Sequence, residues 1–494
     1  MPTETDLLSD YPSEVPISAG EVAAALRSSG RPPRIFVVLD DDPTGTQSVA
    51  DLPVLTRWEV EDFSWAFRQG KPAVYVLTNT RSLDAPEAAA RNEEIVRNAL
   101  AAAAAAAEPE ALRLGFVSRG DSTLRGHFPL EPDTIAATVL DATGEPTDGV
   151  VIVPAFPDAG RVTIGGVHYV RAPDLGEDRL VPVSDTEFAR DATFGYRNAS
   201  LAQYVEEKTG GRVPAASVIV LDLGIIRAGS TGGGATASAR AIADAVAGAT
   251  GAVPIVADVV TENDLRALAL GLEEAERRGK RLLYRVGPPF MRARIGQDIR
   301  AELSGSEAYA GTEPSAAGGL IVVGSHVGVT TRQLGILTEQ HQRAHIIGID
   351  VEQLLGERSA AHLDAVVEEV VDRLAQGDVI LQTSRLLVRT SDAAASLGIA
   401  RTVSAAVVAV VNRTLALSPP RFVIAKGGIT SSDVAAHGLQ IRHAMVRGPM
   451  LPGIVSLWEP VDGPAKGIPF VVFAGNVGDD SSLAEVTRKL SSTF

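Results

Sequence analysis

Residues 35–46 read IFVVLDDDPTGT, a short apolar run that leads directly into acidic and hydroxyl residues. The run is rich in β-branched residues, which favours a buried strand. Similar runs recur from Arg34 onward, and longer segments rich in Ala, Leu, Glu and Arg lie between them. Alternation of strands with helices is typical of an α/β protein whose sheets are largely parallel.

The loops that follow the apolar runs differ between the two halves of the chain. Loops carrying Asp, Arg, Thr and Gly follow the first-half runs 35–39, 73–79, 112–118 and 150–156. Loops dominated by Gly, Ser and Thr follow the second-half runs 320–324, 421–425 and 470–474. In open α/β sheets, ligands bind outside the carboxyl ends of the strands. The two halves are therefore predicted to build two half-sites of different chemistry.

The length of 494 residues predicts two or three domains. We expect two, each a largely parallel sheet flanked by helices, with the active site in the cleft between them. The most linker-like stretch is LSGSEAYAGTEPSAAGG, which covers Leu303–Gly319. The expected division is an N-terminal arm 1–33, a first domain 34–302, the linker 303–319 and a second domain 320–494.

The composition disfavours several classes of function. The chain has 45 Lys+Arg against 61 Asp+Glu, a formal net charge of −16, so we expect no nucleic-acid partner. It contains no Cys, which excludes disulfides, thiolate metal sites and cysteine nucleophiles. Its start lacks the pattern of a signal peptide, and no run reaches the ~20 apolar residues of a membrane helix. We therefore expect a cytoplasmic protein without a membrane partner.

The first-half loops offer the side chains that a small polyhydroxy acid needs. Arginine can bind a carboxylate through two hydrogen bonds, and an Asp can take the proton of a reacting hydroxyl. Asp-rich turns also cap helices, and we prefer that role for Asp40. Asp121 lies between Arg119 and Arg125 in one short loop, which is more than a cap requires. The candidate substrate-binding residues are Asp41, Asp42, Arg81, Arg119, Asp121, Ser122, Thr123, Arg125 and Arg161.

The second-half loops are rich in backbone N–H groups. Glycine lets the chain approach a ligand closely, and amides at the start of a helix bind phosphate. A Gly pair after a strand is more often a plain turn, but three such loops in one half favour phosphate binding. The chain has neither G-x-x-x-x-G-K-[ST] nor a G-x-G-x-x-G after a strand, so a nucleotide would be held in another way. The candidate loops are Gly324–Ser325, Lys426–Ser431 and Gly475–Gly478.

Other catalytic patterns find no support. The sequence has no G-x-S-x-G elbow and no H-E-x-x-H motif, which disfavours serine hydrolases and zinc peptidases. Its eight His are scattered. A contact role stays open only for the three that lie in the loops of interest, His127, His168 and His326.

Eight segments carry a family resemblance when they are taken together and in order. They are DDPTGT (41–46), NTRS (79–82), DSTLRG (121–126), PAFPDAGRVTIGGVHYV (154–170), GSHVGVTTRQ (324–333), GGITSSDV (427–434), LPGIVSLW (451–458) and AGNVGDD (474–480). With these segments, the chain from about Arg34 onward resembles the four-carbon acid sugar kinase family. Departures from the family's common residues indicate a subgroup to which the sugar specificity of better-known members need not transfer. These departures are Arg119, Val327, Ile429 and Val477.

The resemblance implies a two-domain kinase that uses ATP to phosphorylate threonate, erythronate or a 3-oxo derivative of such an acid. It also implies that residues 34–302 bind the acid sugar and residues 320–494 bind the nucleotide. Asp42, Arg81 and the 121–125 loop would contact the sugar acid. The residues expected at the nucleotide are Ser325, Lys426, Gly427, Gly428, Thr430, Gly475, Asn476, Val477 and Gly478.

Transfer of a γ-phosphoryl group needs positioning and charge neutralisation, with Mg²⁺ bridging phosphate oxygens. Asp121 and Asp42 are both candidates for the base, and the sequence leaves the choice open. Arg125 and Lys426 are candidates for neutralising the transferring charge, and no residue is assigned to the metal.

Two other functions fit the same residues. One is a kinase of a branched or longer aldonate, and the other is a non-catalytic sensor of a sugar acid or nucleotide. The arm 1–33 is the candidate segment through which a sensor would bind its partner. A second copy of the chain, in a homodimer, completes the expected partners.

Overall fold

The computed structural model describes residues 2–28, 34–106, 112–176, 178–325, 327–383 and 393–494, apart from the side chains of 393–398 and 400. The chain forms two compact units. Unit 1 consists of residues 1–45 and 58–299, and unit 2 consists of residues 46–57 and 300–494.

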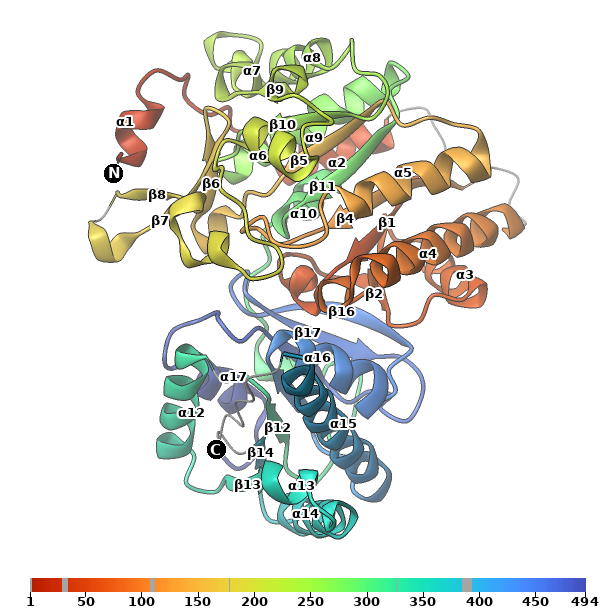
Figure 1. Cartoon of the computed structure of the whole chain (residues 1–494), viewed down its shortest axis with the longest axis vertical. Helices are drawn as coiled ribbons and strands as arrows, with labels where there is room; N and C mark the ends of the chain where they lie inside the picture. Colours follow the sequence, from red (N-terminus) through yellow and green to blue (C-terminus); the bar gives the residue numbers. More distant parts are fainter. Residues whose placement is uncertain (1, 29–33, 107–111, 177, 326, 384–392) are drawn as a thin grey trace. The chain divides into compact units, whose positions relative to one another are not determined.

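Unit 1 is built on a parallel sheet with the strand order β3-β1-β4-β11-β5-β10-β9, and helices alternate with these strands along the chain (Figure 1). The strands are β1 Arg34–Asp40, β3 Ala73–Leu77, β4 Arg113–Arg119, β5 Gly149–Val153, β9 Ile219–Leu221, β10 Val253–Ala257 and β11 Leu282–Val286. The longer helices are α3 Val60–Arg68, α4 Ala85–Ala105, α5 Leu130–Thr143, α6 Leu201–Lys208, α8 Gly234–Ala245 and α9 Glu262–Arg277. The expected α/β fold is confirmed.

Burial on both faces of the sheet explains the apolar runs that mark its strands. Val37 and Val38 of β1 are adjacent, so they point to opposite faces, and both are 0% exposed. Helix α4 finishes at Ala105, within a run of consecutive alanines, and residues 107 and 108 lie outside the described residues.

A second, antiparallel sheet in unit 1 consists of β6 (Arg161–Ile164), β7 (Val167–Arg171) and β8 (Leu180–Pro182). The N-terminal segment packs against it: Leu7, Leu8 and Tyr11 contact its apolar cluster. Arg171 of β7 also donates to both carboxylate oxygens of Glu4, at 2.7 and 2.8 Å. The described part of the arm 1–33, with α1 (Glu4–Leu8) and α2 (Ala19–Arg27), is therefore an integral part of unit 1.

Unit 2 contains a mixed sheet with the order β13-β14-β12-β15-β18-β17-β16-β2. Its parallel strands are β12 Leu320–Val323, β13 His345–Ile349, β14 Val379–Thr383, β15 Val423–Lys426 and β18 Phe470–Phe473. Its antiparallel strands are β2 Leu52–Leu55, β16 His443–Leu451 and β17 Val455–Pro460. Its helices include α11 Gly305–Ala308, α12 Gly328–Gln340, α14 Ser359–Leu374, α15 Ala393–Leu417, α16 Gly428–Asp433 and α17 Ser482–Leu490. Among all described helices, none combines the length and the hydropathy needed to cross a membrane.

The division of the chain differs from a linear one because residues 46–57 belong to unit 2. Strand β2 pairs antiparallel with β16, with Leu52 opposite Val446. The indole Nε1 of Trp458 donates to the Thr46 hydroxyl at 2.9 Å. Because these partners lie about 400 residues away in the sequence, the pattern around residues 46–57 carries no signal that this segment belongs to unit 2.

The expected linker 303–319 also differs, because much of it packs as part of unit 2. Leu303 is 1% exposed and contributes with Ala308 to the core of that unit. Ser304 and Glu307 form a capping box that starts α11. The Gly, Ser and Thr content that suggested a linker instead supplies caps and turns.

Candidate functional site

Within unit 1, the carboxyl ends of three neighbouring strands bring the predicted loops together. Asp40 at the end of β1 is in register with Leu77 of β3 and with Arg119 of β4. The segments that follow are Asp41–Asp42, the 3₁₀ turn Thr80–Ser82 and the loop Gly120–Gly126. The convergence expected at this edge of the sheet is therefore present within unit 1.

Arg81 links two of these segments. Its Nη2 lies 2.6 Å from Asp41 Oδ1, and its Nη1 lies 3.3 Å from Asp42 Oδ2. Asp121 also interacts electrostatically with Arg81 and helps to raise the pKa of its guanidinium, against the effect of burial. One guanidinium thus faces the carboxylates of two different loops.

Arg119 lies beneath these loops. It forms an ion pair with Asp40 and donates to the Asp42 carbonyl, and its side chain is 2% exposed. Burial raises the pKa of Asp40 to about 7, although Arg119 acts in the opposite direction. Gly45 covers the pair, since a Cβ there would lie 2.4 Å from Arg119 Nε. Arg119 and the 1%-exposed Asp41 are covered by protein atoms, unlike Asp42 and Asp121.

Asp121 accepts its side-chain hydrogen bonds through one oxygen. The Thr123 hydroxyl donates to Oδ2, and Arg125 Nε lies 2.6 Å from the same atom. The other oxygen, Oδ1, has no partner among the described residues. Burial favours a raised pKa for Asp121, but Arg81 and Arg125 outweigh it and hold the pKa well below its usual range. Asp121 is therefore an ionised carboxylate with one open oxygen.

Both oxygens of Asp42 are in use. Oδ1 accepts from the backbone N–H of Thr44 at 2.9 Å and from its hydroxyl at 2.6 Å, while Oδ2 faces Arg81. Burial acts to raise the pKa of Asp42, but Arg81 and Arg119 together lower it. Of the two candidate bases, Asp121 is the one with a free acceptor position.

Arg161, at the start of β6, carries a guanidinium that has no acceptor among the described residues. Its buried Nε has no hydrogen-bond partner, and no ion pair joins it to another described residue. Burial lowers the pKa of Arg161, while the nearby carboxylate of Asp121 raises it. A buried donor without an acceptor is costly, so this group is ready to bind an anion.

Sequence reasoning missed a buried network beneath the loops. Glu131 of α5 accepts from the Thr80 hydroxyl at 2.5 Å, from Ser118 Oγ at 3.1 Å and from Arg285 Nη1 at 2.5 Å. Arg285 also packs under the loop, because a Cβ on Gly120 would lie 2.4 Å from its Cζ. Glu131 lies within a helix and Arg285 within a strand, and neither belongs to a motif that would have singled it out.

Of the three histidines for which the sequence leaves a contact role open, two support the loops of the site and one lies outside the described residues. His127 Nε2 lies 3.1 Å from the Thr80 carbonyl and 3.0 Å from that of Leu83, so this ring holds the segment that carries Arg81. His168 contacts the Ser122 carbonyl and is 0% exposed. His326 lies outside the described residues.

Within unit 2, the predicted Gly-rich loops also meet. The Thr330 hydroxyl lies 3.1 Å from Ser325 Oγ and 2.8 Å from the Gly475 carbonyl. A Cβ on Gly324 would overlap Thr430 Oγ1 at 1.9 Å, which shows how closely these two loops approach. Gly427 has φ +129°, a conformation that favours glycine.

The rest of the predicted nucleotide set lies around this meeting point. Gly428 opens α16, and Asn476 is exposed in the loop after β18. Gln333 Nε2 donates to the Val477 carbonyl at 3.0 Å, and Gly478 has φ +82°.

Lys426, predicted at the nucleotide, is 0% exposed. Its Nζ donates to the Ala474 carbonyl at 2.7 Å and lies 3.8 Å from the centre of the Phe473 ring. Burial lowers the pKa of Lys426 to about 7. The structure therefore places this cation under the Gly475–Gly478 loop.

The part of the chain that the structure describes contains no metal centre made of protein ligands alone. Among the described residues, no group of three or more His, Cys, Asp or Glu side chains could hold a metal ion. Mg²⁺ commonly binds through substrate phosphates and few protein groups, so we assign it no residues.

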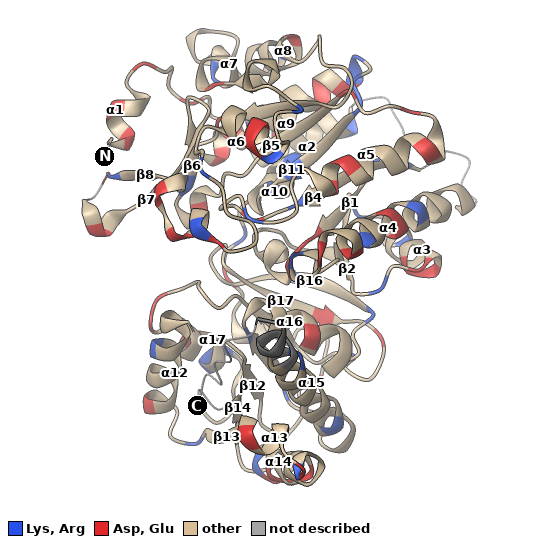
Figure 2. Ribbon diagram, in the orientation of Figure 1, with Lys and Arg blue, Asp and Glu red and all other residues tan. Residues whose placement is uncertain are grey.

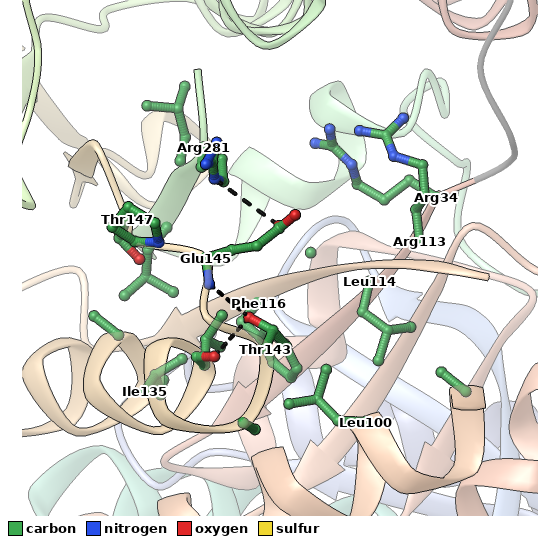
Figure 3. Close-up of a pocket in the computed structure, with 18 of the residues that line it drawn as sticks. Arg34, Leu100, Arg113, Leu114, Phe116, Ile135, Thr143, Glu145, Thr147 and Arg281 are labelled. Atoms are coloured by element: carbon green, nitrogen blue, oxygen red, sulfur yellow. Dashed lines mark hydrogen bonds and ion pairs between the residues drawn. The ribbon is translucent and has the colours of Figure 1, made fainter. Parts of the chain in front are cut away.

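Charge is mixed over the described parts of both units, and one cavity lies away from the predicted loops. Lys and Arg are interspersed with Asp and Glu over the described ribbon of each unit (Figure 2). A cavity of about 580 Å³ lies at the opposite, amino ends of the strands, where Arg34 and Arg113 start β1 and β4. In Figure 3, Glu145 of its lining extends toward Arg281, 3.9 Å away. The cavity is separate from the Asp121 loop and carries none of the predicted residues.

Comparison with known proteins gives two family matches. Residues 36–294 match the family model described as a sugar-binding N-terminal domain. Residues 320–483 match the model described as a nucleotide-binding C-terminal domain.

The chain is also similar to a curated relative and to solved structures, two of which are described here. A D-erythronate kinase of Heliobacterium modesticaldum is 28% identical over 272 residues, which are 54% of this chain and 52% of the relative. The match thus spans about half the length of that relative. A crystal structure from Salmonella typhimurium LT2 has a TM-score of 0.63 and 19% identity over 93% of this chain and 100% of its own. One from Haemophilus influenzae has a TM-score of 0.58 and 18% identity over 92% and 99%. At these identities the two structures support the fold alone.

Proposed function

The chain belongs to the four-carbon acid sugar kinase family, and from that premise we propose that it transfers the γ-phosphoryl group of ATP to the terminal hydroxyl of a four-carbon sugar acid. The observation that carries this proposal is a guanidinium and a carboxylate that lie near each other. Arg161 has no hydrogen-bond acceptor among the described residues and interacts electrostatically with Asp121, which has one open carboxylate oxygen. A sugar acid presents the two complementary groups, a carboxylate and a hydroxyl. Both residues lie in the segment that matches the sugar-binding domain.

Arg161 is proposed to bind the carboxylate of the acid. A guanidinium can donate two parallel hydrogen bonds to a carboxylate, which fixes the orientation as well as the position of the ligand. Binding would also give this guanidinium an acceptor, which it lacks among the described residues. A neutral sugar alcohol would leave that donor unpaired, so the same contact selects acids.

Asp121 is proposed to accept the proton of the attacking hydroxyl at Oδ1. In the reaction the hydroxyl oxygen forms a bond to the γ-phosphorus, the bond from that phosphorus to the β,γ-bridging oxygen breaks, and ADP leaves. The proton of the hydroxyl passes to Asp121. Because Arg81 and Arg125 keep the pKa of Asp121 low, it stays ionised and orients the hydroxyl before the proton moves late in the step.

The loops of unit 2 are proposed to bind ATP through backbone N–H groups. The convergence of Gly324–Ser325, Gly427–Thr430 and Gly475–Gly478 supports this assignment, as does the match of this segment to a nucleotide-binding domain. Lys426 is proposed to support the last of these loops through the Ala474 carbonyl. Mg²⁺, arriving with the nucleotide, would supply charge neutralisation at the phosphates.

A substrate panel tests the proposal. The purified full chain is incubated with ATP and Mg²⁺ and with threonate, erythronate, their 3-oxo derivatives, and branched, five- and six-carbon aldonates. ADP release gives the rate, and ³¹P NMR identifies the phosphorylated position. We expect turnover with a four-carbon acid at its terminal hydroxyl. Turnover only with longer or branched acids would move the proposal to that substrate class, and no ADP release with any acid would reject a kinase.

A further inference from the structure

Three consecutive backbone carbonyls of the Asp121 loop each accept a hydrogen bond from a side chain of another segment. His168 Nε2 in β7 lies 2.8 Å from the Ser122 carbonyl. The Tyr196 hydroxyl lies 2.7 Å from that of Thr123, and the Tyr204 hydroxyl of α6 lies 2.9 Å from that of Leu124. We call these three side chains the carbonyl clamp: His168, Tyr196 and Tyr204.

The donors of the clamp are fixed in place. A carbonyl only accepts, so Nε2 of His168 carries the hydrogen, and its Nδ1 accepts from the Thr163 hydroxyl 2.9 Å away. Burial lowers the pKa of His168 to about 4, which keeps the ring neutral. The Tyr196 and Tyr204 rings pack edge to face at 5.6 Å. Their side chains are 5% and 3% exposed, so water does not compete for the carbonyls.

The clamped loop holds an unfavourable backbone conformation. Leu124 has φ +67°, in the left-handed region that side chains with a Cβ seldom adopt. Such a residue persists only where the surroundings determine it, and residues of this kind cluster at functional sites. The Tyr204 hydroxyl bonds to the carbonyl of this same residue.

The strained loop has a direct consequence for Asp121. Its course places the Thr123 hydroxyl and Arg125 Nε on the same carboxylate oxygen, Oδ2. The other oxygen is thereby left open. A shift of the carbonyls at residues 122–124 would move Thr123 and Arg125 and change which oxygen is free.

We propose that His168, Tyr196 and Tyr204 are positioning residues that hold the Asp121 loop in the conformation in which Oδ1 can accept the substrate hydroxyl. This inference rests on the proposed function and adds Tyr196 and Tyr204, which lie outside the segments that carry the family resemblance. None of the three needs to touch the substrate. Their effect is on geometry, and a displacement of about 1 Å at a reacting group can cost roughly 10²-fold in rate.

Single-hydroxyl variants test the clamp with a matched control. Y196F and Y204F each remove one buried hydroxyl and keep the ring. Y309F in unit 2 removes the same kind of bond, from a tyrosine hydroxyl to the Leu490 carbonyl at 2.7 Å, away from the loop. Loss of one such hydrogen bond corresponds to a roughly 5-fold lower rate. We expect kcat to fall about 5–10-fold in each clamp variant and more than 25-fold in the double variant, with KM for ATP unchanged and with Y309F equal to wild type in kcat.

Hydrogen exchange provides a readout that does not depend on turnover. Amides 121–126 should exchange faster in Y196F and Y204F than in wild type, and at the wild-type rate in Y309F. Unchanged exchange and unchanged kcat in both clamp variants would overturn this inference alone. A wild-type chain without turnover on any sugar acid would overturn the proposed function, and the clamp's catalytic role with it.

Histidine variants separate a fixed donor from a titrating group. The amide N–H of Gln in H168Q can still donate to the Ser122 carbonyl, whereas Leu in H168L cannot. We expect H168Q to retain most of the kcat that H168L loses, with a pH–rate profile between pH 5.5 and 9 that matches wild type. A limb near pH 6.5 that disappears in H168Q would show His168 titrating during turnover, which contradicts its role as a fixed donor.

Discussion

Asp121 and Asp42 should respond differently to replacement by Asn. Replacing Asp121 by Asn removes the open carboxylate oxygen and should lower kcat about 10²–10⁴-fold, the range for loss of a general base. KM for ATP should not change. Replacing Asp42 by Asn disturbs the contacts with Thr44 and Arg81 and should mainly raise KM for the sugar acid. Steady-state kinetics of both variants decide the assignment: a larger kcat loss in D42N than in D121N would make Asp42 the base.

Arg161 should determine whether the enzyme prefers an acid over the corresponding alcohol. R161M removes the guanidinium proposed to bind the carboxylate and should raise KM for the acid roughly 10–100-fold. The much slower turnover of the matching alditol should barely change. R97M, on the exposed surface of α4, is the control, because Arg97 is 44% exposed and pairs only with surface acids. An equal loss of activity of R161M on the acid and on the alditol would show that the carboxylate of the substrate binds at another residue.

Lys426 should make the stability of unit 2 depend on pH. Burial lowers its pKa in the folded state to about 7, below the usual value of ~10.4 in the unfolded chain. Between these values the unfolded state binds more protons, so the free energy of unfolding rises with pH; the cost of burying the charge is fully present below pH 7. K426M should remove about 2–4 kcal/mol of that rise between pH 7 and 10. Urea unfolding of wild type and K426M at pH 7, 8.5 and 10 measures this difference. Parallel pH dependences of the two free energies of unfolding would show that folding does not lower the pKa of Lys426.

At the scale of elements, Gly126 fixes the end of the Asp121 loop. It has φ +115°, and a Cβ there would lie 2.8 Å from Arg285 Nη2 and 2.9 Å from Asp41 Oδ2. G126A should therefore cost stability through its backbone and activity through the displaced loop. G144A is a matched control, since Gly144 ends α5 at φ +74° with nothing within 4 Å of a Cβ.

Thermal unfolding and kinetics separate the two effects of these glycine variants. Both should lose about 1 kcal/mol of stability, because each forces a Cβ into a conformation that favours glycine. Only G126A should lose activity, by 10-fold or more in kcat/KM, because only there does the Cβ meet two charged side chains of the site. A G126A enzyme with wild-type kinetics would show that the loop tolerates the displacement.

The strand ends were the part of the site that the sequence could predict. Each apolar run that marked a strand is buried on both faces, and the loop after it is the first place where polar residues are tolerated. That rule predicts that Asp121 and Arg125 lie in a loop at the end of a strand, and the structure places them in the loop that follows β4. It could not predict that Arg119 is buried, because that burial depends on contacts with Gly45 and Asp40.

The support beneath the loops could not be predicted in the same way. Glu131, Arg285, Tyr196 and Tyr204 act through contacts between segments that are far apart in sequence, and their spacing follows no local period. Tyr196 and Tyr204 look like ordinary core aromatics in a sequence. What distinguishes them is the partner of each hydroxyl, which is a property of the tertiary structure.

At the scale of the whole molecule, the chain passes between its two units at three points, after residues 45, 57 and 299. Sequence patterns predict a single continuous stretch of chain for each domain. The short segment 46–57 departs from this because its hydrogen-bond partners, in β16 and at Ser456 and Trp458, belong to unit 2. A segment of that length carries too little pattern of its own to reveal a partner so distant in sequence.

Unit 2 should therefore need residues 46–57 in order to fold on its own. A fragment 300–494 leaves the pairing edge of β16 open and removes Thr46, which bonds to Ser456 Oγ at 2.9 Å and to the indole of Trp458, a side chain that is 1% exposed. An exposed strand edge and a buried donor without its acceptor favour aggregation and cost stability.

The experiment compares the fragment 300–494 with a chain in which 46–57 is joined to 300–494 through a Gly/Ser linker. We expect the joined chain to unfold cooperatively, with a free energy of unfolding at least about 2 kcal/mol higher than that of 300–494. A joined chain with a scrambled 46–57 sequence is the control. Because a folded nucleotide site binds its ligand and an unfolded one does not, ATP with Mg²⁺ should raise the midpoint of the joined chain. Equal stability of 300–494 with and without its own 46–57 segment would show that unit 2 is complete without β2.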